Sequence, residues 1–197
     1  MLGSKTEKIS DTKHNLRTMN IAVYCSARKD IAPECFADAR ALGRWIGENG
    51  HTLVYGGLRM GLMDAVASAT AAAGGKVIGV VPWHRKEMEH PDNTTDIYVT
   101  TLHERKQTME ENADAYVALD GGYGTLDEVM SALASGSFFD EPKPLILLNR
   151  NDLYTPLMQM FDTMVQRGLM FPHIRTRVTL CPTLADVVEH LGQCASE

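Results

Sequence analysis

The sequence predicts an α/β fold in which a mostly parallel sheet is covered by helices on both faces. Short apolar runs, rich in β-branched and aromatic residues, alternate with longer segments of helical periodicity. This alternation is typical of parallel strands joined by right-handed helical crossovers. Because ligands of such sheets bind outside the carboxyl ends of the strands, the residues that follow each predicted strand are candidates for a functional site.

The first half of the chain opens with a polar, aperiodic segment, residues 1–18, which we expect to be a disordered leader. One nucleotide-binding catalytic domain, residues 19–197, is expected to follow, since this length suffices for a single well-buried core. Strands are predicted at 19–25 (MNIAVYC), at 51–55 (HTLVY, followed by two glycines) and at 76–82 (KVIGVVP). Helices are predicted at 33–49, where apolar residues recur every three or four positions, and at 60–75, which ends in two glycines.

The second half begins after a polar segment, residues 83–96 (WHRKEMEHPDNTTD), which we interpret as an irregular, mobile lid. Further strands are predicted at 97–100, 115–119, 144–149 and 177–181. Helices are predicted at 102–113, after Thr125, at 153–167 and from Leu184 onward. The same alternation therefore continues to the end of the chain.

Composition excludes several classes of protein. The 19 basic and 25 acidic residues give a net charge of -6, which argues against a general nucleic-acid surface. No apolar run approaches the roughly 18 residues of a membrane span, and no signal peptide is recognisable, so no membrane partner is expected. The 4 cysteines are widely spaced, as in a cytoplasmic protein with reduced thiols. The histidines lack metal-ligand spacing, so we predict no metal site.

The stretch LDGGYGTLDEV, residues 119–129, follows a predicted strand and leads into a helix. Gly121, Gly122 and Gly124 allow backbone N–H groups to approach an anion, the helix N-terminus adds a positive dipole, and Thr125 adds a hydroxyl. The stretch is not a Walker A loop, because no lysine follows its last glycine, and it lacks the third glycine of the dinucleotide fingerprint. A phosphate site is therefore predicted, with a simple tight turn as the alternative.

The sequence alone does not decide the roles of two acidic residues in this stretch, Glu128 and Asp120. Thr125 and Glu128 match a capping box, in which Glu128 would bond the N–H of the cap residue. A carboxylate one helical turn from a phosphate could instead take part in catalysis. Asp120 stands directly before the glycines, and we expect its carboxylate to point away from the anion and to bond N–H groups of the turn.

Basic residues also follow several predicted strands, namely Arg28, Arg59, Arg105 and Lys106. Solvated loop charge is the simple interpretation of each. Thr101 and Glu104 match a capping box, so Arg105 and Lys106 fall near the start of a helix, where a cation opposes the dipole at a cost of roughly 0.3–1 kcal/mol. An anion bound nearby would remove this cost, so two adjacent exceptions to a local rule indicate function.

Taken together, LHERK and GGYGTLDE resemble the paired motifs of the LOG family, the cytokinin riboside 5'-monophosphate phosphoribohydrolases. LVYGGLRMGLMDAVASAT and GGKVIGVVP resemble the second and third units of that family, so the resemblance runs from about Asn20 to Leu191. It implies a three-layer Rossmann-like fold, no cofactor, and a homodimer with active sites near the subunit interface. The implied reaction is hydrolysis of the N-glycosidic bond of a nucleoside 5'-monophosphate to free base and ribose 5-phosphate. Relatives are often labelled lysine decarboxylases, but nothing here resembles a pyridoxal-phosphate site.

The resemblance implies roles for individual residues. Arg105 and Glu128 would be the catalytic pair. The phosphate and ribose would be bound by Gly121, Gly122, Gly124, Thr125, Lys106, Ser26, Gly56 and Gly57. The chain departs from the family pattern at Asp120, which replaces a proline, at Ser26–Ala27 in the first loop, and at Leu58, which replaces a glycine. Residues 134–137 replace a common T-W-x-Q segment, so the base stays open, and AMP or an N6-modified AMP is the expected substrate.

Two alternatives remain. A non-catalytic nucleotide-binding protein or molybdenum-cofactor carrier could share this fold, although binding alone does not require both Arg105 and Glu128. A ribosyl- or phosphoribosyltransferase would replace water by another acceptor, for which the sequence shows no second obvious site.

Overall fold

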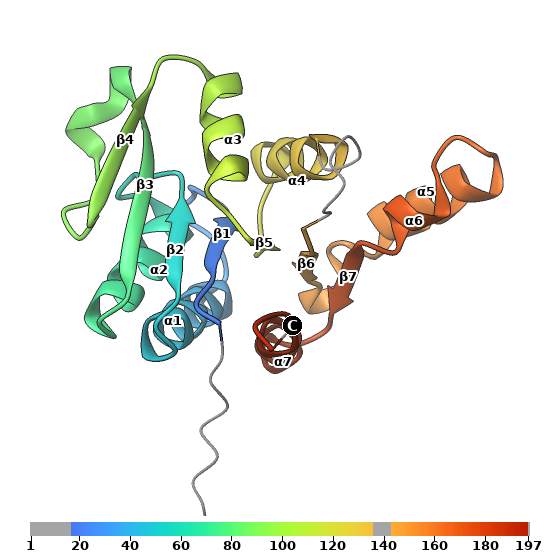
Figure 1. The fold of residues 1–197 in the computed structure, drawn as a ribbon, viewed down its shortest axis with the longest axis horizontal. Coiled ribbons are helices and arrows are strands. Elements are labelled where there is room, and N and C mark those ends of the chain that lie inside the picture. The colour runs from blue at the N-terminus through green and yellow to red at the C-terminus, as the bar shows by residue number, and fades with distance from the viewer. Residues whose placement is uncertain (1–16, 136–142, 197) are drawn as a thin grey trace, which may run out of the picture.

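The computed structural model describes residues 17–135 and 143–196, and its centre is a parallel sheet (Figure 1). The strands are β1 (Asn20–Tyr24), β2 (Thr52–Tyr55), β3 (Lys76–Pro82), β4 (Thr95–Val99), β5 (Ala115–Ala118), β6 (Leu145–Leu148) and β7 (Val178–Cys181). In the described part of the chain they form one 7-stranded sheet in the order β4-β3-β2-β1-β5-β6-β7. All neighbouring pairs are parallel. The predicted α/β class and Rossmann-like arrangement are therefore confirmed.

Helices cover both faces of the sheet, which gives three layers (Figure 1). One face carries α1 (Pro33–Glu48), α2 (Gly61–Ala72) and α7 (Leu184–Cys194). The other face carries α3 (Leu102–Glu111), α4 (Tyr123–Ser135), α5 (Thr155–Gln166) and the short α6 (Pro172–Arg175). Two 3-10 helices, η1 (Trp83–Met88) and η2 (Arg150–Asp152), lie in connections. Because β1, β5 and β6 are covered on both sides, they are almost wholly apolar and buried.

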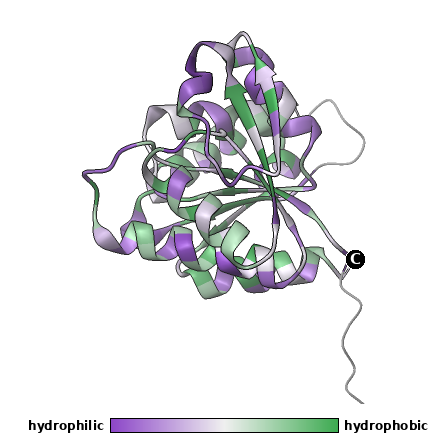
Figure 2. Cartoon of the chain, turned by 90° about the vertical axis from the view of Figure 1, so that its left-hand side faces the viewer, coloured by the Kyte–Doolittle hydropathy of each residue, from purple (hydrophilic) through white to green (hydrophobic). Residues whose placement is uncertain are grey.

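Two apolar clusters fill the spaces between the layers, and Figure 2 shows hydrophobic residues along the strands. Helix α1 buries the predicted stripe that includes Ala39, Leu42 and Ile46. It packs closely on α2 because a Cβ atom at Gly43 would lie 2.3 Å from the Val66 carbonyl oxygen. Close packing of this kind fixes the carboxyl ends of β1 and β2 relative to each other.

Some boundaries differ from the predictions. Part of the segment expected to be irregular, residues 83–96, is regular, since it forms η1 and the start of β4. Helix α4 begins at Tyr123, before Thr125, and the four-residue α6 was not foreseen. Within the described residues, no helix is long and apolar enough to cross a membrane.

The predicted leader lies mostly outside the described residues, which begin at Arg17. The Arg17 N–H donates to the Ala195 carbonyl at 2.9 Å, and its guanidinium pairs with Asp114 at 3.0 Å. The folded part therefore includes Arg17, two residues before the predicted boundary.

Candidate active site

The candidate site lies at the carboxyl edge of the sheet, where the strand order reverses between β1 and β5. Such a switch point opens a crevice between the loops that follow the two central strands. Here the Ser26 N–H after β1 donates to the Asp120 carbonyl after β5 at 3.0 Å. The glycine loop that begins at Gly121 therefore sits at the position where this class of sheet binds ligands.

Arg105 on α3 reaches across the ends of β2 and β3. Its Nε donates to the Val80 carbonyl at 3.1 Å, and its Nη2 donates to the Gly56 carbonyl at 2.9 Å. Its Nη1 lies 3.4 Å from Oε1 of Glu128 on α4. A Cβ atom at Gly56 would lie 1.7 Å from Nη2, so a glycine is required for this placement. Two carbonyls thus orient a guanidinium whose third nitrogen faces a carboxylate.

Glu128 is the carboxylate of this pair, and its side chain is only 14% exposed. Burial raises the pKa of Glu128 to about 7, while the positive charge of Arg105 opposes the shift. Since α4 begins at Tyr123 and Glu128 faces Arg105, the capping-box interpretation of Glu128 is wrong. A carboxyl group that has a pKa near neutrality and lies beside an arginine at the carboxyl edge of such a sheet is a typical catalytic candidate.

Cys25, directly after β1, lies in the surroundings of the pair. Burial raises the pKa of the Cys25 thiol well above its usual range, and the nearby Glu128 carboxylate adds to the shift. The Cys25 thiol is therefore neutral and adds no charge near Glu128.

The glycine loop leads into the first turn of α4. The Leu126 N–H donates to the Gly122 carbonyl at 3.0 Å, which leaves the preceding N–H groups without intrahelical acceptors. Cβ atoms at Gly122 or Gly124 would meet nothing within 4 Å, so this side of the loop is open. Thr125 is 3% exposed and packs beneath Gly121, where a Cβ atom would lie 2.0 Å from the Thr125 Oγ1.

The basic residues near the strand ends fall into two groups. The side chains of Arg105 and Lys106 are 14% and 20% exposed, and Lys106 Nζ lies 2.7 Å from the Asp127 carboxylate on α4. The interpretation as solvated loop charge is therefore wrong for both. Arg28 and Arg59 are well exposed and pair with Asp30 and Asp64, as that interpretation predicts.

The start of α3 matches its predicted cap. Thr101 Oγ1 accepts from the Glu104 N–H at 3.0 Å. The Glu104 carboxylate bonds the Thr100 N–H at 2.7 Å, one residue earlier than a capping box predicts. This cap fixes the first turn of α3, from which Arg105 extends.

Asp120 faces α1. Burial raises the pKa of the Asp120 carboxyl group, and the nearby Cys35 thiol on α1 opposes this shift. Within the described residues, the expected bonds from N–H groups of the turn to this carboxylate are not formed. Among the described residues, the Asp120 Oδ2 atom is buried without a hydrogen-bond partner. Ser26 uses its N–H for the Asp120 carbonyl, so the structure does not leave that donor for a phosphate.

The fold and the site define a Rossmann-like α/β protein that has an open glycine loop next to a partly buried arginine–carboxylate pair. A family described as "possible lysine decarboxylase" matches residues 63–191. A cytokinin riboside 5'-monophosphate phosphoribohydrolase of Rhodococcoides fascians is 34% identical over 172 residues, which cover 86% of this chain and 87% of that protein. A protein of the same name in Mycobacterium tuberculosis is 34% identical over 170 residues, which cover 85% of this chain and 90% of that protein. The chain belongs to this family, the LOG family.

Solved structures share the fold. A molybdenum cofactor carrier protein of Chlamydomonas reinhardtii superposes with a TM-score of 0.72 at 25% identity, covering 92% of this chain and 100% of that one. A molybdenum cofactor binding protein of Rippkaea orientalis gives a TM-score of 0.70 at 22% identity, covering 90% and 97%. In the described residues, no group of three or more His, Cys, Asp or Glu side chains is arranged to hold a metal ion.

Proposed function

We propose that the protein hydrolyses the N-glycosidic bond of AMP, or of an N6-modified AMP, to free base and ribose 5-phosphate. The observation that carries the proposal is the Arg105–Glu128 pair, with an Nη1–Oε1 distance of 3.4 Å, beside the open glycine loop. The names of the relatives support the same reaction class. The chemistry suits these residues because the bond breaks through a ribosyl cation, which a carboxylate stabilises.

The substrate phosphate is proposed to bind the N–H groups of Gly121, Gly122 and Gly124 at the start of α4, with Thr125 shaping the loop from below. Lys106 adds a positive charge, and the Gly56–Gly57 turn and Ser26 border the ribose. Phosphate binding is remote from the bond that breaks, so it holds the ring for the reaction. Glu128 lies about one helical turn from the proposed phosphate site, which suits a substrate whose reacting carbon is only a few bonds from its phosphate ester.

Glu128 acts as a carboxylate in this mechanism. It stabilises the cation that develops at the anomeric carbon and accepts a proton from the attacking water, whose oxygen forms the new bond to that carbon. The electron pair of the broken bond stays on the base, which takes up a proton. Arg105 bridges phosphate and ribose and keeps Glu128 in place.

The test is incubation with a panel of nucleoside monophosphates and chromatographic detection of free bases. We expect AMP or an N6-modified AMP to be cleaved, and adenosine to be cleaved several orders of magnitude more slowly, since each lost charge-assisted hydrogen bond costs roughly 1.5–3 kcal/mol. Equal rates with adenosine and AMP would contradict the phosphate anchor. Transfer of the phosphoribosyl group to an added acceptor rather than to water would favour a transferase.

Carriage of a molybdenum cofactor is the second candidate, because the Chlamydomonas reinhardtii carrier shares 25% identity and the whole fold. The partly buried Arg105–Glu128 pair favours hydrolysis, since binding alone does not require a carboxylate there. Tight binding of molybdenum cofactor without cleavage of any monophosphate would favour the carrier function.

We also infer a cytoplasmic location. The support is that Cys25, Cys35 and Cys181 are buried thiols, as in proteins of a reducing compartment. Fractionation of cells that express the full chain tests this inference.

A further inference from the structure

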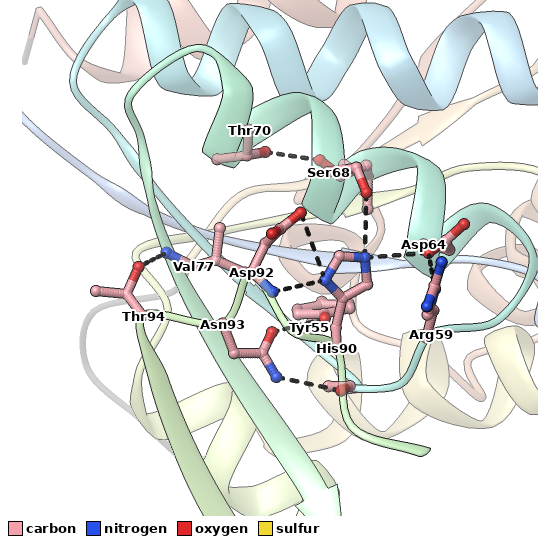
Figure 3. A network of polar contacts seen from close by, with 12 residues as sticks. Tyr55, Arg59, Asp64, Ser68, Thr70, Val77, His90, Asp92, Asn93 and Thr94 are labelled. Atoms are coloured by element: carbon pink, nitrogen blue, oxygen red, sulfur yellow. Dashed lines mark hydrogen bonds and ion pairs between the residues drawn. The ribbon is translucent and has the colours of Figure 1, made fainter.

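A buried histidine, His90, lies at the centre of a polar network between α2 and the segment that precedes β4 (Figure 3). The residue is 2% exposed. Its Nε2 lies 3.1 Å from the Asp64 Oδ1 and 3.2 Å from the Ser68 Oγ, both on α2. Its Nδ1 accepts from the Asp92 N–H at 3.1 Å. A backbone N–H only donates, so a neutral ring carries its proton on Nε2 and donates it toward Asp64.

This arrangement is not a nucleophilic triad, although it contains a serine, a histidine and an aspartate. Ser68 and Asp64 meet the same ring nitrogen, and that nitrogen carries the proton. His90 in this state does not accept a proton from Ser68, so it does not activate the hydroxyl. The network therefore holds structure in place rather than performing chemistry of its own.

The segment that contains His90 and precedes β4 also holds the turn after β2 in place. The His90 N–H donates to the Gly57 carbonyl at 3.0 Å, and Asn93 Nδ2 donates to the same oxygen at 3.2 Å. Asn93 is itself fixed by the Tyr55 hydroxyl, which donates to its Oδ1 at 2.7 Å. Gly57 has a φ of 75°, and a Cβ atom there would lie 2.6 Å from Val81 Cγ2. The turn thus has little room to move.

The turn leads directly to the candidate catalytic pair, because the Gly56 carbonyl accepts from Arg105 Nη2 at 2.9 Å. We propose that His90 is a positioning residue for Arg105. The contacts of its ring with α2 fix the position of His90 and therefore of its N–H group, which holds the Gly57 carbonyl. A fixed Gly57 in turn fixes the neighbouring Gly56 carbonyl, which orients the Arg105 guanidinium. This inference deepens the proposed function and rests on it for its kinetic consequences.

Two substitutions separate the contacts of the ring. His90→Gln retains an amide nitrogen that can reach Asp64 in place of Nε2. His90→Asn retains an acceptor for the Asp92 N–H but is too short to reach Asp64. Because small misplacements of catalytic groups cost up to about a hundredfold, we expect His90→Asn to lower kcat for AMP about tenfold or more. His90→Gln should recover most of that loss.

His51 supplies the matched control. It is 1% exposed, and its Nδ1 also accepts a backbone N–H, that of Met19 at 3.1 Å. It precedes β2, at the end opposite Gly56, so His51→Asn should affect stability but leave kcat close to the wild-type value. Comparable kcat losses in His90→Asn and His51→Asn, or no recovery in His90→Gln, would overturn the proposal.

A second readout does not depend on activity. The Arg105 Nε–H is bonded to the Val80 carbonyl, and NMR of 15N-arginine-labelled protein reports its exchange with solvent. We expect faster exchange in His90→Asn, and wild-type exchange in His51→Asn and His90→Gln. Unchanged exchange in His90→Asn would also overturn the inference. If the wild type cleaves no monophosphate, the proposed function fails, while this readout still tests the role of His90.

Discussion

At the scale of single residues, the position of Arg105 depends on main-chain carbonyls more than on acidic partners. The Gly56 and Val80 carbonyls lie at 2.9 and 3.1 Å, whereas the Glu128 carboxylate lies at 3.4 Å. Carbonyls orient a guanidinium without neutralising it, so its charge stays available to an anionic substrate.

Gly56→Ala should reduce activity and leave stability nearly unchanged. The new Cβ would lie 1.7 Å from Arg105 Nη2, the far end of a flexible side chain, which moves at little cost to the fold but loses its orientation. We expect kcat/KM for AMP to fall about a hundredfold. Gly192→Ala on α7, where a Cβ atom meets nothing within 4 Å, is the control and should leave activity unchanged. Wild-type kinetics of Gly56→Ala would show that Arg105 need not occupy its observed position.

Glu128 should impose a pH dependence on catalysis. The pKa of its carboxyl group is about 7, and the carboxylate is the active form, so kcat/KM should rise as pH increases from 5 to 8, with a midpoint near the pKa. Glu128→Gln should bind AMP with most of the wild-type affinity, lose most turnover and lack this pH dependence. Glu189→Gln, which changes an exposed carboxylate on α7, should behave as wild type. Normal turnover in Glu128→Gln would leave Glu128 without a catalytic role.

At the scale of elements, α3 and α4 carry the candidate catalytic pair in their N-terminal halves, and the starts of these two helices are set differently. Thr101 caps α3 through its side chain, whereas the Gly122 carbonyl begins α4. The α3 cap keeps Arg105 and Lys106 close to the crevice despite the unfavourable helix dipole, and acidic groups on α4 offset their charges.

Thr101→Ala and Thr183→Ala form a matched pair, because both threonines are N-caps that accept a backbone N–H. Each substitution should lower the free energy of unfolding by about 1 kcal/mol. Only Thr101→Ala should also lower kcat/KM, because α3 carries Arg105 while α7 carries no candidate site residue. Denaturant titration and AMP kinetics test both effects. Equal kinetics for the two variants would show that fraying of α3 does not reach Arg105.

The alternating pattern of the sequence sufficed to predict the strands and the long helices, because apolar periodicity reports directly on burial. It misplaced the start of α4, since Thr125 and Glu128 match a capping box although the Gly122 carbonyl already begins the helix. It missed α6, which at four residues is too short to show periodicity. The paired motifs indicated Arg105 and Glu128, but not the carbonyls that hold Arg105 or the proposed role of His90, because main-chain acceptors leave no residue-type signal.

At the scale of the whole molecule, α4 leaves an apolar stripe uncovered. Tyr123, Leu126 and Met130 recur at spacings of three and four and are 93%, 36% and 40% exposed. Phe138 and Phe139, two neighbouring large apolar residues in the stretch SGSFFDEP, would also favour an interface, but they lie outside the described residues. A further large apolar side chain that the fold leaves uncovered is Leu102 at the start of α3, which is 66% exposed.

We predict that a second copy of the chain covers this stripe, which would place the interface next to the glycine loop. Sedimentation velocity at micromolar concentration should show a dimer, and Met130→Asp should shift the equilibrium toward monomer. Met160→Asp, at an exposed position on α5, should not. A wild-type monomer at these concentrations would contradict the prediction.

The hydrogen bond between Arg17 and Ala195 has a consequence for the connectivity of the chain. At 2.9 Å, it brings the two ends of the described domain together on the surface, away from the glycine loop. A circular permutant that joins these ends by a short linker, and opens between Leu169 and Phe171, both well exposed, would keep the spatial order of the strands. We expect it to fold and to retain the Arg105–Glu128 pair, as circular dichroism and AMP binding would show. The site would then depend on where the elements lie in space and not on the order in which the chain is synthesised.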